Sequence, residues 1–164
     1  MSRSLNGTDL AAIRSFVDSL GTFDLIRNLD YYHMEVDNST DALHYLLNKS
    51  GYGSLLSHFM QREDMSSTDI GNMVALPHPF LKGSETSAKI VIGINDHNIT
   101  WGKQNVRLVI IYIPASDLKT NKDFFNDVCQ RTSDITLVQS LLKSQTKSEF
   151  IKLWNSKGVN KNAI

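Results

Sequence analysis

The sequence has 164 residues, with 17 Lys and Arg against 17 Asp and Glu, and 41% of its residues are hydrophobic. This length and mixture fit one globular domain of roughly 100–200 residues, neither too charged to collapse nor apolar enough for a membrane protein. The equal charges argue against a surface whose main task is to hold nucleic acid or anionic lipid, because both need an excess of Lys and Arg.

Cysteine content and the N-terminal sequence bear on the compartment. Cys129 is the only cysteine, which excludes an intrachain disulfide framework and a multi-cysteine zinc site. No apolar run approaches the roughly 18 residues of a membrane span, and MSRSLNGTDL lacks the apolar stretch of a signal peptide. We therefore expect a cytoplasmic protein.

Apolar residues at helical spacing alternate with capping residues and glycines in the first part of the chain. The spacing predicts a first helix over residues 10–20, with Thr8 as its N-cap. A short strand is expected over residues 31–36. Helices follow over residues 42–50, closed by glycines, and over residues 55–64.

Three further segments are dense in β-branched and other apolar residues. Residues 73–76, 89–94 and 106–113 are predicted as strands, and the last is expected to be central because it is apolar on both faces. The remaining segments predict helices over residues 124–129 and 135–142. A final helix opens with the capping box at residues 146–149.

Strands interleaved with helices in this way favour a three-layer α/β/α sandwich, with helices on both faces of a buried sheet. Chemistry is then expected in loops at strand ends.

Prolines on both sides confine His78 to an extended backbone. Pro77 and Pro79 fix their own φ angles and keep the preceding residues out of the α region. The imidazole is thus presented rigidly at the end of the strand over residues 73–76. This spacing fits a histidine that only satisfies a tight turn as well as it fits a functional imidazole.

Residues upstream of His78 offer a cation and several hydroxyl groups. Arg62 is expected at the end of a helix, and Ser66, Ser67 and Thr68 lie between it and the strand. An imidazole nitrogen can act as a covalent nucleophile, and a phosphoryl group on it needs donors and a guanidinium for its oxygens. Singly, each feature is more typical of a solvated helix end or a turn cap.

The whole string from Arg62 to His78, REDMSSTDIGNMVALPH, resembles the fructose/mannitol class (type 2) of enzyme IIA (EIIA) domains of the bacterial sugar phosphotransferase system (PTS). In that family an Arg-Glu pair, a Ser or Thr, an Ile-Gly, a short apolar strand and Pro-His recur in this order. The similarity extends over residues 29–154. It implies the family's α/β/α fold with a mixed sheet for residues 29–158, and leaves residues 1–28 as an accessory helix or linker.

The resemblance also implies roles for three residues. His78 corresponds to the histidine that accepts a phosphoryl group from the phosphocarrier protein HPr. Arg62 corresponds to the arginine that stabilises the phosphoryl oxygens, and Thr68 to a hydroxyl near the phosphohistidine. Onward transfer would make the chain a phosphohistidine phosphotransferase, whereas retention would make it a regulatory phosphoacceptor; no metal or cofactor is required.

Departures from the family pattern favour a regulatory role. Mannitol transport domains carry a second histidine after the strand that corresponds to residues 106–113, where this chain has Asn121, Lys122 and Asp123. Pro79 in place of glycine, and the stretch over residues 99–102, look more like the EIIA-like domains of transcriptional regulators and antiterminators with PTS regulation domains (PRDs). DNA contact would then belong to other domains of a longer regulator.

Two alternatives remain. The chain is either a transport EIIA that passes phosphate to an EIIB protein during sugar uptake, or a protein-binding module that never takes phosphate. The sugar is not readable, because the EIIA domain contacts proteins.

The other histidines are interpreted as structural or solvated, at His33 in a strand, His44 and His58 in helices, and His97 in a polar turn. Cys129 is predicted to be a small core residue of its helix, and Trp101 a packing residue.

Overall fold

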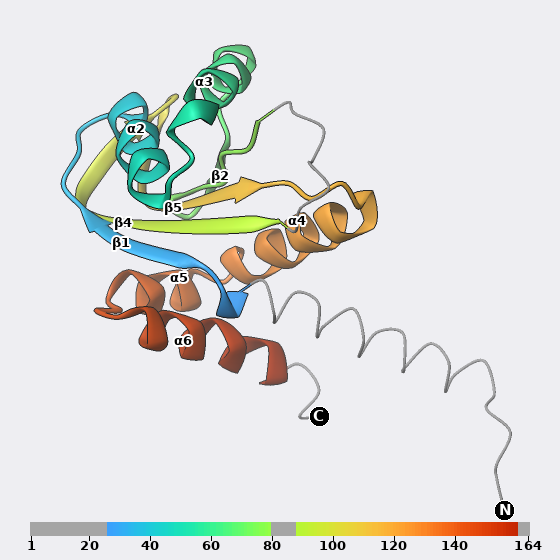
Figure 1. The fold of residues 1–164 in the computed structure, drawn as a ribbon. Coiled ribbons are helices and arrows are strands. Elements are labelled where there is room, and N and C mark those ends of the chain that lie inside the picture. The colour runs from blue at the N-terminus through green and yellow to red at the C-terminus, as the bar shows by residue number, and fades with distance from the viewer. Residues whose placement is uncertain (1–25, 80–87, 161–164) are drawn as a thin grey trace, which may run out of the picture.

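The computed structural model describes residues 26–79 and 88–160, which form a sheet with helices on both faces (Figure 1). The elements are β1 Asp30–Met34, α2 Ser39–Ser50, the short 3-10 helix η1 Gly53–Leu55, α3 Leu56–Met65, β2 Asp69–Gly71, β3 Val74–Ala75, β4 Lys89–Trp101, β5 Gln104–Ile113, α4 Leu118–Thr132, α5 Ile135–Leu142 and α6 Lys147–Asn160. The predicted helix over residues 10–20 lies outside the described residues. None of the helices described is both long and apolar enough to cross a membrane.

The five strands form one mixed sheet in the order β1-β4-β5-β3-β2. β1 is parallel to β4, β4 is antiparallel to β5, β3 is parallel to β5, and β2 is antiparallel to β3. The prediction that the strand over residues 106–113 is central is confirmed, since β5 lies in the middle. By this topology, the C-terminal end of β3 lies at the same edge of the sheet as the beginning of β1 and β4.

Two apolar cores lie on the two faces of the sheet. α2 and α3 cover one face, and α4, α5 and α6 cover the other (Figure 1). Successive residues of β5 serve both cores: Ile110 belongs to the core beneath α4, and Val109 and Ile111 belong to the core beneath α2. The predicted three-layer α/β/α arrangement is confirmed.

Capping residues delimit α2 and open α6 as the sequence predicts, whereas α4 begins at Leu118, earlier than predicted. The Asn38 side chain accepts a backbone N–H in the first turn of α2, and Gly51 ends that helix with φ 86°. At the start of α6, the Glu149 N–H donates to the Thr146 hydroxyl at 3.1 Å, and the Glu149 carboxylate accepts from the Gln145 N–H at 3.0 Å. The return bond of the capping box therefore reaches one residue further back than in its usual form.

β4 is longer than predicted. It continues past Ile94 to Trp101, with an irregular register between Ile94 and Ile99. His97 therefore lies in a strand, and the predicted polar turn is wrong. The irregular pairing leaves Asp96 and His97 exposed, which is why this part of the strand carries polar residues.

The segment before His78 also differs in detail. β3 is limited to Val74 and Ala75, and β2 was not predicted. Asp69–Gly71 lacks the alternation of a half-buried strand, so its pairing with β3 has no local signal.

Cys129 is exposed on α4, so its predicted core position is wrong. The buried positions of that helix are Phe124, Val128 and Thr132. Cys129 follows Val128 and is rotated about 100° from it around the helix axis, away from the sheet.

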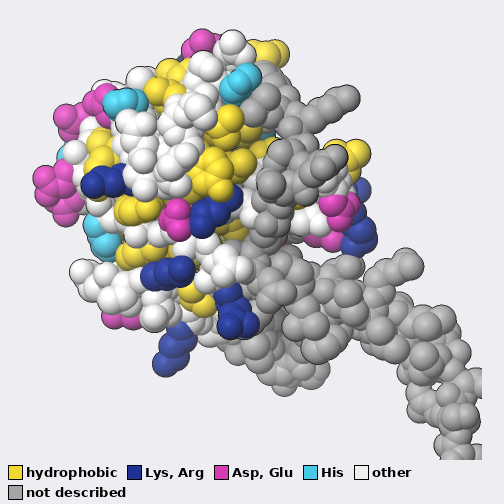
Figure 2. All heavy atoms as spheres, viewed as in Figure 1, with side chains coloured by type: hydrophobic (Ala, Val, Ile, Leu, Met, Phe, Trp, Pro, Cys, Tyr) yellow, Lys and Arg dark blue, Asp and Glu magenta, His cyan; other side chains and the backbone are white. Residues whose placement is uncertain are grey.

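Charged side chains are dispersed over the visible face of the molecule (Figure 2). Figure 2 shows Lys and Arg scattered among hydrophobic and acidic groups on one face. This agrees with the neutral composition of the chain.

Candidate functional site

His78 lies at the C-terminal end of β3, held against β5. The Tyr112 N–H donates to the Pro77 carbonyl at 3.0 Å, which extends the contact with β5 beyond the two residues of β3. The imidazole is half-buried and meets the Phe125 ring of α4 edge to face, with ring centroids 5.0 Å apart. The extended, proline-flanked residue predicted from the sequence is therefore wedged between the sheet and α4.

A hydrogen bond to the backbone identifies the tautomer of His78. Its Nδ1 atom lies 2.9 Å from the Leu76 carbonyl oxygen. A carbonyl oxygen only accepts, so Nδ1 carries a proton and donates it. In the neutral ring, Nε2 then keeps its lone pair and is the nucleophilic nitrogen.

The surroundings of His78 favour the neutral imidazole. Burial is the main cause that lowers the pKa of His78 below its ordinary value. The Arg62 charge lowers the pKa further, whereas the bond to the Leu76 carbonyl and the Glu63 charge raise it. The net lowering keeps the Nε2 lone pair available near neutral pH.

Arg62 lies in the last turn of α3. One guanidinium nitrogen donates to the Ser66 carbonyl at 2.7 Å and to the Ser66 hydroxyl at 3.2 Å. The positive charge of Arg62 lowers the pKa of His78, so the two groups interact electrostatically. The predicted cation therefore acts on the imidazole through its charge, from a helix on the face of the sheet opposite α4.

Thr68 is buried, at 4% exposure, and its hydroxyl donates to the Glu63 carboxylate. Its N–H donates to the same carboxylate at 3.2 Å, and its carbonyl accepts the Leu76 N–H at 2.9 Å. The structure therefore brings Thr68 next to the backbone that leads into His78, but its one hydroxyl proton is directed at Glu63. Sequence reasoning assigned no role to Glu63, and its signal was its place in the Arg-Glu pair that the resembled family shares.

Asn121 lies near the start of α4, in the segment where the resemblance to mannitol transport domains would imply a second histidine. Its Oδ1 accepts from the Tyr112 hydroxyl at 2.5 Å and from the Ala115 N–H at 3.0 Å, and its Nδ2 donates to the Ala115 carbonyl at 2.8 Å. Asn121 therefore holds the loop between β5 and α4. The aromatic group that contacts His78 from this helix is Phe125, one turn later.

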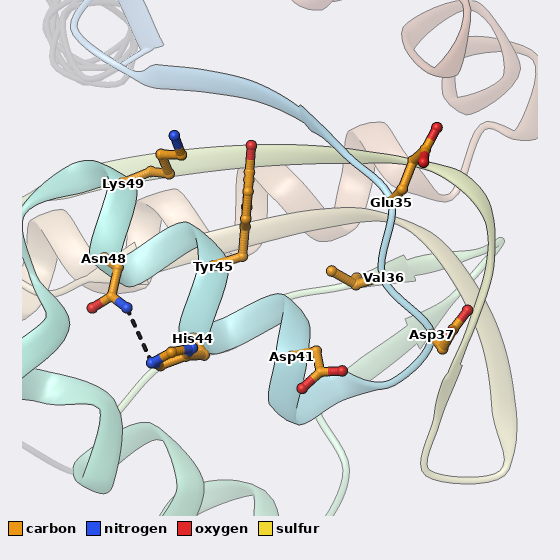
Figure 3. Close-up of a pocket in the computed structure, with 8 residues that line it drawn as sticks. All are labelled: Glu35, Val36, Asp37, Asp41, His44, Tyr45, Asn48 and Lys49. Carbon is orange, nitrogen blue, oxygen red and sulfur yellow. Dashed lines mark hydrogen bonds between the residues drawn. The ribbon is translucent and has the colours of Figure 1, made fainter.

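A hollow of about 540 Å³ lies at the other end of the sheet, after the C-terminal end of β1. Figure 3 shows its lining, which is Glu35, Val36, Asp37, Asp41, His44, Tyr45, Asn48 and Lys49. His44 and Asn48 are hydrogen-bonded to each other at 3.0 Å. Across residues 26–79 and 88–160, no group of three or more His, Cys, Asp or Glu side chains is arranged to hold a metal ion.

Comparison with known protein families shows which family the chain belongs to. Residues 34–157 match the family described as "Phosphoenolpyruvate-dependent sugar phosphotransferase system, EIIA 2". The chain belongs to this family. The EIIA 2 match covers all the elements of the His78 site.

Curated relatives of this EIIA 2 domain include both regulators and a transport component. The chain is 30% identical over 95 residues to the Transcriptional regulator ManR of Bacillus subtilis, covering 57% of the chain and 14% of ManR. It is 26% identical over 134 residues to the mannitol-specific phosphotransferase enzyme IIA component of Geobacillus stearothermophilus, covering 75% of the chain and 89% of that protein. The chain thus spans a small part of the regulator and most of the transport component.

Solved structures share the fold of the EIIA 2 domain. The nitrogen regulatory protein IIA-Ntr of Neisseria meningitidis superposes with a TM-score of 0.68 at 17% identity, covering 80% of this chain and 97% of the other. The IIA mannitol structure from Escherichia coli gives 0.64 at 17% identity, covering 77% and 95%.

Proposed function

We propose that residues 29–158 form a phosphoacceptor domain that takes a phosphoryl group from phospho-HPr on Nε2 of His78. The observation that carries this proposal is the Nδ1–H bond to the Leu76 carbonyl, because it leaves the Nε2 lone pair for attack. The lowered pKa of His78 supports it further, since a neutral ring is required.

The proposed step forms one bond and breaks one. The Nε2 lone pair attacks phosphorus while the P–N bond of the donor phosphohistidine breaks, and its electron pair returns to the donor imidazole. Nδ1 of His78 keeps its proton and its bond to the Leu76 carbonyl throughout. The Arg62 guanidinium stabilises the charge on the transferring oxygens, so neither an acid nor a base on this chain is needed.

A regulatory role is the favoured setting for this chemistry. The similarity to ManR supports it. Asn121 supports it too, because its bonds hold the β5–α4 loop in the segment where mannitol transport domains carry a second histidine. In this reading, phosphorylation of His78 in the cytoplasm sets the activity of a PRD-containing, sugar-responsive regulator. Other domains would contact DNA, and residues 1–28 would be a linker.

Transfer to an EIIB protein is the second candidate. It is favoured by the mannitol enzyme IIA relative, which the chain covers over 89% of its length. A solved complex of IIA mannitol with phosphorylated IIB mannitol from Escherichia coli also shares the fold, with a TM-score of 0.64 at 16% identity.

Incubation with phosphoenolpyruvate, enzyme I and HPr tests the proposal. We expect the wild type to be labelled and His78→Ala to stay unlabelled. Equal labelling of both proteins would refute His78 as acceptor, and no labelling of the wild type by active donors would favour a protein-binding module. Adding an EIIB protein separates the first two roles, because only a transport domain discharges its label onto it.

A further inference from the structure

The Glu63 carboxylate joins three segments of the fold. One oxygen accepts the Thr68 hydroxyl. The other accepts the Thr68 N–H at 3.2 Å and the indole N–H of Trp101 at 3.1 Å. Three donors from two segments fix this carboxylate in one orientation, at the end of α3.

The hydrogen bonds continue from Glu63 to the imidazole. The Thr68 carbonyl accepts the Leu76 N–H at 2.9 Å, and the Leu76 carbonyl accepts Nδ1–H of His78 at 2.9 Å. Each bond fixes the backbone segment that makes the next one. A displacement of Thr68 would therefore move the carbonyl that orients the ring.

Glu63 also anchors the helical turn that carries Arg62. Phe59 is the one residue of α3 that is buried, so the last turn has little apolar packing of its own. Trp101, at the end of β4, is completely buried. The indole N–H bond to Glu63 therefore joins the last turn of α3 to the buried end of β4.

We propose that Glu63 is a positioning residue for phosphoryl transfer, which holds the Arg62 turn and the Thr68–Leu76 backbone in the arrangement that presents Nε2 of His78. The chemistry of this inference rests on the proposed function. In this arrangement Thr68 acts through its bond to Glu63, and not as a free donor to the phosphoryl group.

Electrostatics give a second readout of the same contact. The charged groups that act on the pKa of His78 are Arg62 and Glu63, both from α3. α4 and β5 face the imidazole with aromatic rings, Phe125 directly and Tyr112 behind it at 5.2 Å. Removal of the Glu63 charge is therefore expected to lower the pKa of His78, because the Glu63 carboxylate favours the imidazolium.

Glu63→Gln is the informative variant, because it keeps the shape and one acceptor oxygen. The amide nitrogen replaces one carboxylate oxygen, so the three donors lose part of their acceptor and the bond chain loosens. Asp64→Asn is the matched control, since it removes the same charge from the next, exposed residue of α3. We expect Glu63→Gln to lower kcat for labelling by phospho-HPr about tenfold with an unchanged KM, and Asp64→Asn to behave as wild type.

Nitrogen-15 histidine NMR on the unphosphorylated full chain tests the inference independently of transfer. We expect Glu63→Gln to lower the pKa of His78 and to reduce the share of the Nδ1–H tautomer, while Asp64→Asn keeps both at wild-type values. Wild-type titration and tautomer in a folded Glu63→Gln would overturn the inference, as would a loss expressed in KM alone. If Glu63→Gln fails to fold, Trp101→Phe removes one donor and must lower kcat at constant KM. A wild type that takes no phosphoryl group overturns the proposed function, and the NMR result then decides the role of Glu63 alone.

Discussion

Replacement of Phe125 with alanine tests whether the aromatic wall keeps the His78 imidazole neutral. The Phe125 ring meets His78 at 5.0 Å and Tyr112 at 5.2 Å, and burial is the largest cause of the lowered pKa of His78. Without the ring, water reaches the imidazole. The pKa of His78 is then expected to rise toward its ordinary value.

The magnitude follows from that ordinary value. An imidazole with a pKa of about 6.5 is about one quarter neutral at pH 6 and almost fully neutral at pH 8. Because only neutral Nε2 attacks, labelling of Phe125→Ala at pH 6 falls toward about a quarter of its own rate at pH 8. The wild type, with its lower His78 pKa, keeps a larger share of its pH 8 labelling rate at pH 6. Loss of the ring contacts with His78, Tyr112 and Phe124, at about 0.5–1.5 kcal/mol each, also lowers Tm.

The assay compares initial labelling rates at pH 6 and pH 8, with nitrogen-15 NMR titration of His78 on the same proteins. The pH dependence of the donor proteins is common to all variants and cancels in the comparison. Leu118→Ala is the control, since Leu118 begins the same helix and is 82% exposed. A folded Phe125→Ala with the wild-type rate ratio and the wild-type pKa would refute the reasoning.

Three other substitutions have defined outcomes. Arg62→Ala is expected to slow labelling by roughly 10- to 150-fold, the worth of a charged hydrogen bond, and Lys122→Ala much less; equal rates would count against Arg62 as the phosphate ligand. Asn121→Ala is expected to destabilise the fold by about 1–3 kcal/mol in urea unfolding, because the Tyr112 hydroxyl loses its acceptor, while labelling persists. Gly51→Ala is expected to cost about 1–2 kcal/mol, since its φ of 86° disfavours a side chain, and an unchanged unfolding midpoint would contradict this.

Local patterns account for most of the fold. The strand that became β5 is apolar at nearly every position, and such a run is typical of a strand buried on both faces. α5 begins and ends where its apolar period does, at Ile135 and Leu142. In contrast, β2 and the outer part of β4 form through pairing with neighbouring strands, so their own residues carry little signal.

The candidate site also combines features that local sequence predicts with contacts that it does not predict. The two prolines predict how His78 is presented, because they act on the adjacent backbone. The bond between Glu63 and Trp101 joins residues 38 positions apart, and no spacing rule indicates it. Thr68 was expected near the phosphohistidine as a donor. Its hydroxyl bonds to Glu63 because the chain turns back after α3, and no local pattern predicts that contact.

The nitrogen that carries the phosphoryl group tests the central claim most directly. After incubation with phosphoenolpyruvate, enzyme I and HPr, long-range proton–nitrogen NMR distinguishes the two ring nitrogens of each histidine. We predict that Nε2 of His78 is phosphorylated and that Nδ1 stays protonated against the Leu76 carbonyl. Phosphorylation on Nδ1, or on any other residue, would contradict the account.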